Sequence, residues 1–187
     1  EAINLVASVV PKEGRGRVLL SALEHHSNIV PWQLAGYQID VVPLTADGRI
    51  DLDIAEAMIS EQHRVVSLAH VSNVLGYVNP AREIARVARA AGAMVAIDGA
   101  QGAPHVEVDV QDIGCDVYVW SGHKMLGPMG TGAVWGRREL LDRLPPYHVG
   151  SNMAHAVTLD HADLEVGAQK YQAGTPNVAG PVGLHAA

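Results

Sequence analysis

Three polar residues that could do chemistry together, Ser121, His123 and Lys124, directly follow a short apolar run at residues 117–120. The run is β-branched or aromatic, which is typical of a buried strand. Lys124 therefore lies just past a strand end, where open α/β sheets bind their ligands. Apolar neighbours favour the neutral form of a lysine amine, and a neutral amine can form a Schiff base with a carbonyl. This stretch alone leaves open the alternative of a solvated lysine in a surface turn.

Other polar residues follow other predicted strands. His25 follows the first strand, Asn73 the third, and Asp98 and Gln101 the fourth. The residue patterns predict strands at 17–21, 39–43, 64–70, 94–97, 117–120 and 132–135, and helices at 52–59, 80–91 and 137–144. Because the carboxyl ends of parallel strands meet at one edge of a sheet, we expect these side chains to lie beside Lys124.

Strands and helices alternate along the chain, which indicates an α/β fold with a mainly parallel sheet and helices on both faces. The last predicted strand, 132–135, is expected to return as a hairpin after the glycine-rich residues 127–132. Those glycines do not form a nucleotide loop, because the P-loop ending is absent and a strand follows where a dinucleotide site needs a helix. Beyond Pro146 the pattern weakens, and we expect loop structure.

Composition excludes several function classes. The 187 residues are 48% apolar with a net charge of -7, and no run of lysine and arginine offers a nucleic-acid surface. No apolar run is long enough to span a membrane. Cys115 is the single cysteine, which rules out an internal disulfide and fits a reducing compartment, so we expect a cytoplasmic protein. We expect no metal site, since no histidine pair has helical i, i+4 spacing.

The polar residues expected at this edge match the needs of pyridoxal 5'-phosphate (PLP). Lys124 would hold the cofactor as a Schiff base, and the carboxylate of Asp98 would keep its ring nitrogen protonated. His25 could stack on the ring and Gln101 could donate to its phenolic oxygen. The phosphate would be bound by Ser121 and His123. Plainer alternatives remain open: Asp98 could be a turn residue, and Gln101, like Asn73, could simply satisfy loop backbone.

Four segments resemble, in order, the motifs of class V aminotransferase-fold enzymes: residues 24–32, 70–76, 98–101 and 121–124. Within that class they are most similar to the cysteine desulfurase and selenocysteine lyase group of the SUF type. The resemblance implies the large domain of a PLP-dependent transferase of fold type I. It also implies that Lys124 and His25 are catalytic as well as cofactor-binding residues.

The same resemblance implies roles for two further positions and an assembly. Asn73 matches a position that contacts the cofactor or the substrate carboxylate. Thr175, in the segment 173–177, matches a threonine that reaches the phosphate in the partner subunit. We therefore expect a homodimer that shares its two sites.

In that group L-cysteine gives alanine and an enzyme persulfide, whose sulfur passes to an acceptor protein for iron–sulfur cluster assembly. A cysteine thiolate attacks the substrate sulfur, but Cys115 precedes the lysine strand, so we expect it to be a buried cysteine instead. The alternatives are another class V enzyme, namely a selenocysteine lyase, a kynureninase-like hydrolase, a transaminase or an epimerase, or a non-catalytic fragment that acts by association.

The resemblance further implies that residues 1–187 are the central part of the PLP-binding large domain. The phosphate-binding loop would precede this stretch, and the small domain with the nucleophilic cysteine would follow it. We therefore expect the chain to be inactive on its own.

Overall fold

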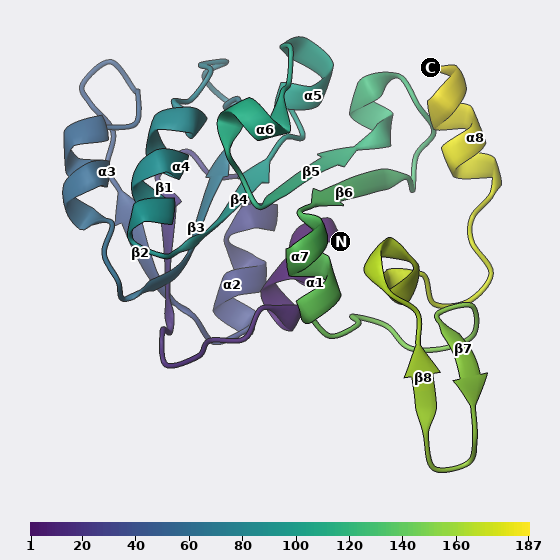
Figure 1. Cartoon of the computed structure of the whole chain (residues 1–187). Helices are drawn as coiled ribbons and strands as arrows, with labels where there is room; N and C mark the ends of the chain where they lie inside the picture. Colours follow the sequence, from purple (N-terminus) through teal and green to yellow (C-terminus); the bar gives the residue numbers. More distant parts are fainter.

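A six-stranded sheet forms the centre of the structure, a computed structural model that describes all residues, 1–187 (Figure 1). Its strand order is β2-β1-β3-β4-β5-β6. Strands β1 to β5 pair in parallel, and only β6 runs antiparallel, beside β5. The strands are β1 (Arg17–Ser21), β2 (Gln38–Val42), β3 (His63–Ala69), β4 (Met94–Asp98), β5 (Val117–Ser121) and β6 (Gly132–Gly136). The predicted mainly parallel sheet and the predicted hairpin return are both confirmed.

Helices cover both faces of the sheet because successive strand residues point to opposite sides. In β1, Val18 and Leu20 pack in one buried cluster and Leu19 in the other. The first cluster includes α1 (Ala2–Val9), α2 (Val30–Leu34) and α7 (Arg138–Arg143), and the second includes α3 (Leu52–Met58), α4 (Ala81–Ala90), α5 (Gly102–His105) and α6 (Val110–Ile113). All helices fall short of the length and apolar character that crossing a bilayer requires.

The register of the central strands brings three strand ends close together: β3 and β4 end at the same level, and β5 ends two residues further on. Ala69 is paired with Asp98, and Asp98 with Val119. The connections also change direction at β1, which lies between β2 and β3. A change of this kind opens a crevice at the carboxyl ends of the strands, which is where ligands of such sheets bind.

The C-terminal part differs from the loop that we predicted beyond Pro146. It holds an antiparallel hairpin of β7 (Ala154–Val157) and β8 (Ala162–Leu164), the short helix η3 (Gly167–Tyr171) and α8 (Ala179–Ala186). The hairpin projects from the body (Figure 1). Its residues are nearly all exposed, and its strands of four and three residues are too short for their residue pattern to predict them clearly.

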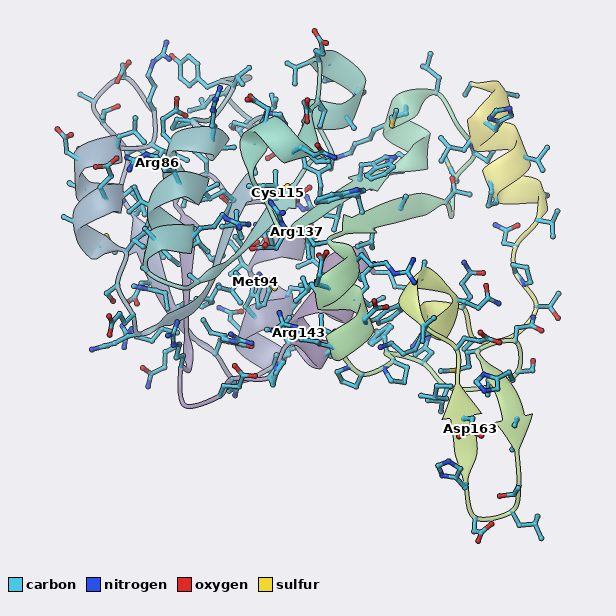
Figure 2. All side chains as sticks on the ribbon, in the orientation of Figure 1. Arg86, Met94, Cys115, Arg137, Arg143 and Asp163 are labelled. Carbon is cyan, nitrogen blue, oxygen red and sulfur yellow. The ribbon has the colours of Figure 1, made fainter.

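At the opposite edge of the sheet from the three strand ends, Asp116 fixes the start of β5. Its Oδ2 accepts a hydrogen bond from the Val95 backbone at 2.9 Å, and its Oδ1 lies 3.0 Å from Arg89 and 3.1 Å from Arg137. The guanidinium of Arg137 also donates to the carbonyl of Cys115 at 3.0 Å (Figure 2).

Gly99, which follows β4, is required by the close approach of Tyr118 in β5. A Cβ atom at position 99 would lie 2.0 Å from the Tyr118 ring. The tyrosine is buried, and its hydroxyl is 2.9 Å from Nδ1 of His70. A ring held between two neighbours in this way cannot move aside cheaply.

We predict that Gly99→Ala destabilises the protein by about 2 kcal/mol, because the added methyl overpacks the Tyr118 ring. Urea unfolding followed by circular dichroism measures the change. Gly16→Ala is the control, since no atom lies within 4 Å of a Cβ added there. Equal stabilities of the two variants would contradict the role of Gly99.

Candidate active site

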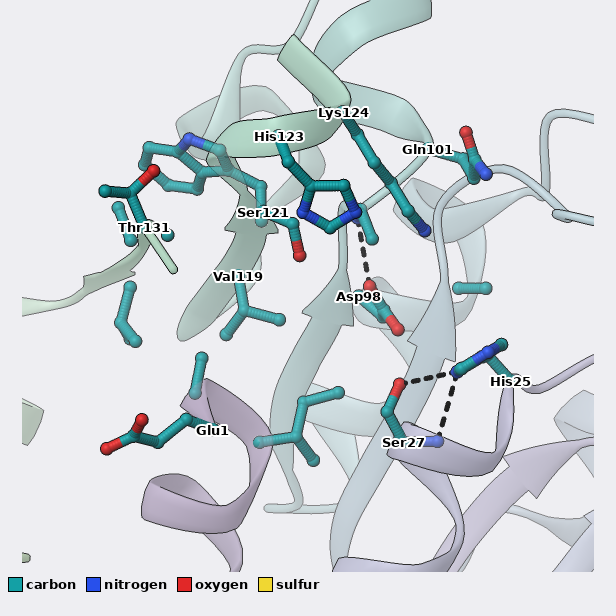
Figure 3. A pocket seen from close by; sticks show the side chains of 18 of the residues that line it. Glu1, His25, Ser27, Asp98, Gln101, Val119, Ser121, His123, Lys124 and Thr131 are labelled. Carbon is teal, nitrogen blue, oxygen red and sulfur yellow. Dashed lines mark hydrogen bonds between the residues drawn. The ribbon is translucent and has the colours of Figure 1, made fainter. Parts of the chain in front are cut away.

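A cavity of about 790 Å³ lies at the carboxyl ends of the central strands (Figure 3). Seven of the eight residues that the sequence singled out line it together: His25, Asn73, Asp98, Gln101, Ser121, His123 and Lys124. Their expected meeting at one sheet edge is therefore confirmed. Thr175 is not among the lining residues; it is exposed in the segment between η3 and α8.

Lys124 and His123 are placed by the short helix η2 (Gly122–Met125), which begins where β5 ends. Leu126 closes this turn in the left-handed conformation, with φ of 63°. The backbone N–H of Gly122 donates to the Thr131 carbonyl at 2.9 Å, which fastens η2 to the chain entering β6. The turn directs the half-buried Lys124 side chain into the cavity, toward Asp98 (Figure 3).

Asp98 ends β4 and is buried, with 6% of its surface exposed. Its Oδ1 accepts a hydrogen bond from the Ala100 backbone at 2.9 Å, which leaves Oδ2 for a ligand in the cavity. Burial raises the pKa of this carboxyl above its usual range, while the Ala100 hydrogen bond and the charges of Lys124 and His25 oppose the rise. The site therefore holds a carboxylate that lacks a full counter-charge.

His25 lies across the cavity from Lys124, in the turn that leads from β1 into η1 (His26–Asn28) (Figure 3). Its Nδ1 accepts a hydrogen bond from the Ser27 backbone at 3.2 Å and lies 2.8 Å from Ser27 Oγ. Because a backbone N–H can only donate, Nδ1 is an acceptor and the neutral ring carries its proton on Nε2. The tautomer of His25 is thus set by its own turn.

Two lining residues were missed from the sequence. Ser27 hydrogen-bonds His25, and Asn28, the next residue, is buried. The cap of α2 is Ile29, without a side-chain hydrogen bond. The hydroxyl of Thr131 donates to the Pro128 carbonyl at 2.6 Å at the far side of the cavity. The only signals in the sequence for Ser27 and Thr131 are that both residues are hydrophilic and lie near the motifs.

Cys115 lies outside the cavity, before β5, while Lys124 follows that strand. It is fully buried, and burial raises the pKa of its thiol to about 11, with the charge of Asp116 adding to the rise. The thiol therefore stays protonated near neutral pH and is not a nucleophile.

The donor set of the cavity fits PLP. An amine at Lys124 suits the aldehyde, a buried carboxylate at Asp98 suits a protonated ring nitrogen, and the imidazole of His25 lies across from the amine. Ser121 and His123 add a hydroxyl and an imidazole beside the amine, a combination that can bind phosphate oxygens. A volume of about 790 Å³ also lies within the range of cofactor sites.

We predict that Asp98→Asn stabilises the cofactor-free protein at neutral pH. Because its pKa is raised in the folded state, folded Asp98 binds more protons than unfolded Asp98, so stability falls as pH rises through this window. An asparagine has no carboxyl group to titrate, so this fall of stability with pH disappears. Its side-chain oxygen can still accept the hydrogen bond from the Ala100 backbone. Thermal unfolding should give a higher midpoint for the variant at about pH 8, with a gap that narrows in acid. Asp53→Asn, at an exposed position, is the control; a variant less stable than the wild type at every pH would contradict the argument.

The model of the family described as aminotransferase class-V matches residues 1–187. A protein of Xylella fastidiosa (strain 9a5c) named "Probable cysteine desulfurase" is 45% identical over 193 residues, which cover 100% of this chain and 46% of that protein. The chain thus spans about half the length of the curated relatives it matches.

Solved structures agree with this match. The cysteine desulfurase CsdA (S-sulfonic acid) of Escherichia coli has a TM-score of 0.95 at 38% identity, over 99% of this chain and 48% of that one. The apo cysteine desulfurase of Thermococcus onnurineus NA1 has a TM-score of 0.92 at 34% identity, over the same shares. With its whole length matched and its sheet superimposable on these enzymes, the chain belongs to the class V aminotransferase family.

Proposed function

We propose that this chain is the cofactor-binding part of a PLP-dependent cysteine desulfurase, which converts L-cysteine into alanine and an enzyme persulfide. The family is PLP-dependent, and the similar proteins named above are cysteine desulfurases. The observation that carries the proposal is the juxtaposition of Lys124, Asp98 and His25 in one cavity. The persulfide sulfur would pass to an acceptor protein for iron–sulfur cluster assembly.

Bound PLP supplies an electron sink for bond cleavage in an amino acid. Lys124 would bind the cofactor through Nζ and, once released by the substrate amine, would move protons at the substrate. Asp98 would hold a proton on the ring nitrogen through its free Oδ2, since a buried carboxylate favours a cationic neighbour. His25 would orient the ring from the opposite wall, with its Nε2–H available as a donor.

The remaining lining residues would bind and orient. Ser121 and His123 would donate to phosphate oxygens beside the lysine, and Gln101 would donate to the ring oxygen. Asn73, which is exposed at the cavity mouth, would contact the cofactor or the substrate carboxylate. Each of these side chains would hold the reacting atoms in place, and none of them would have to gain or lose a proton.

The persulfide-forming thiolate would come from a segment outside residues 1–187. Cys115 is too deeply buried and too weakly acidic for the role, as described above. We accordingly propose that residues 1–187 are the central part of the large domain, completed by a phosphate-binding loop on one side and a small domain on the other.

We also propose that the complete protein is a cytoplasmic homodimer in which Thr175 serves the partner's phosphate. Thr175 is exposed, and the Gly174 backbone beside it is held by hydrogen bonds to Ser151 and Asn152 at the base of the hairpin. Large apolar residues are exposed in the same part of the chain, a feature of interaction surfaces. They include Val157, Leu159, Val166, Val178 and Val182.

We predict that the wild-type protein gains visible absorption when PLP is added and that Lys124→Ala abolishes it, because Lys124 is the only lysine that lines the cavity. Absorption and fluorescence titrations measure both binding and the covalent link. Lys12→Ala is the matched control, since this exposed lysine donates to the Gly36 carbonyl and lies outside the site. Identical spectra of the wild type and Lys124→Ala would refute lysine-bound PLP.

We predict that the protein expressed from the complete reading frame releases sulfide from L-cysteine in the presence of a reducing thiol, with alanine formed in equal amount. Lys124→Ala should lower the rate at least 100-fold, as expected for loss of a general acid–base group. Sulfide and alanine assays measure the two products. Formation of a keto acid, or turnover of kynurenine in place of cysteine, would assign another class V reaction.

A further inference from the structure

Glu24 is a buried carboxyl next to His25 that the proposed function does not use. Only 8% of its surface is exposed. Its Oε1 lies 2.5 Å from the hydroxyl of Ser21 at the end of β1, and its Oε2 accepts a hydrogen bond from Nδ2 of Asn28 at 2.7 Å. The carboxyl thus clamps both ends of the turn that carries His25.

The orientation of the Asn28 amide is fixed by its other partners. Its Oδ1 accepts hydrogen bonds from Trp32 Nε1 at 3.1 Å and from Ser67 Oγ at 2.7 Å. Because indole N–H can only donate, the amide must point its NH₂ group at Glu24. Oε2 of Glu24 is therefore an acceptor in either protonation state, and any proton on Glu24 must lie on Oε1, facing Ser21.

Ser21 can receive that proton. Its hydroxyl already accepts a hydrogen bond from the Leu23 backbone at 3.1 Å and has a second lone pair to offer. A glutamine at position 24 would reproduce this arrangement, with its NH₂ donating to Ser21 and its carbonyl accepting from Asn28. Ser21 donates to Oε1 when Glu24 is ionised and can accept from it when Glu24 is neutral, so the contacts of Glu24 with Ser21 and Asn28 can be kept in both protonation states.

The charges around Glu24 favour the neutral form. Strand β1, η1, α2 and β3 contribute only uncharged groups, namely Ser21, Asn28, Trp32, Ser67 and the Ala69 backbone. The charged neighbour is Asp98 from β4, which has Lys124 and His25 as favourable partners of its own. Burial raises the pKa of Glu24 to about 7; the hydrogen bonds from Ser21, Asn28 and the Ala69 backbone oppose the rise, and the charge of Asp98 adds to it.

We propose that Glu24 is a positioning residue of the site: it holds the His25 turn against the ends of β1 and β3, and it carries a proton so that Asp98 bears the negative charge. Loss of that proton places a second negative charge near Asp98. The proposal rests on the proposed function in so far as PLP occupies the cavity, but the protonation of Glu24 belongs to the free protein as well.

The first test is made without PLP. Infrared spectra of the free protein across pH should contain a protonated carboxyl band that disappears with a midpoint of about 7. Glu24→Gln should remove this band, and Glu61→Gln, at an exposed position, should keep it. A wild-type protein without a Glu24 band below that midpoint overturns the proposal, whatever the result with PLP.

The second test uses PLP titrations. Glu24→Ala should weaken PLP binding at least tenfold at every pH because Ser21 and Asn28 lose their partner and the His25 turn is released. Glu24→Gln should restore the affinity. Relative to Glu24→Gln, the wild type should bind PLP a few-fold more tightly above the midpoint, since ionised Glu24 attracts a cationic ring.

The outcomes separate this proposal from the proposed function. Should the wild type bind PLP while Glu24→Gln keeps the wild-type pH profile, or while Glu24→Ala keeps the wild-type affinity, the role of Glu24 is wrong and the cofactor site stands. Should the wild type fail to bind PLP, the proposed function fails, and the infrared test still decides the protonation of Glu24.

Discussion

The geometry of the candidate site depends on one carboxyl group that is buried inside the protein, that of Asp98 at the end of β4. Burial opposes the charge of Asp98, and only one backbone hydrogen bond, from Ala100, together with the nearby Lys124 and His25, favours it. The surrounding residues determine where Asp98 lies. Gly99 allows the chain to turn tightly against Tyr118, and the register of β3, β4 and β5 puts the end of β3 level with the carboxylate and the end of β5 two residues beyond it.

The sheet can be predicted because two features of the sequence identify each strand. Runs such as residues 117–120 are apolar and β-branched, and each is bounded by turn residues. A parallel sheet then brings all the residues that follow strands to one edge, which is why the sequence alone predicts that His25, Asp98 and Lys124 lie together. Their individual roles remain predictions, since position at an edge does not determine what a side chain does.

The features that the sequence did not reveal depend on contacts made only in the folded chain or on strands too short to be predicted. Serine commonly caps helices, and only the folded turn shows that Ser27 forms a hydrogen bond with His25. The burial of Glu24 could not be predicted, because its segment also contains two histidines, a serine and an asparagine, which are usually exposed. The hairpin of β7 and β8 was not predicted because its strands are short and exposed.

The burial of Cys115 also affects how the complete protein can be studied. Its sulfur donates to the Val110 carbonyl at 3.7 Å inside a packed cluster, and its thiol stays protonated at neutral pH. Alkylating reagents and mild oxidants act on exposed thiolates, so Cys115 does not react with them in the native state. Any thiol label that a longer form of the protein takes up while folded therefore reports on a cysteine outside residues 1–187, without a background that mutagenesis would have to remove.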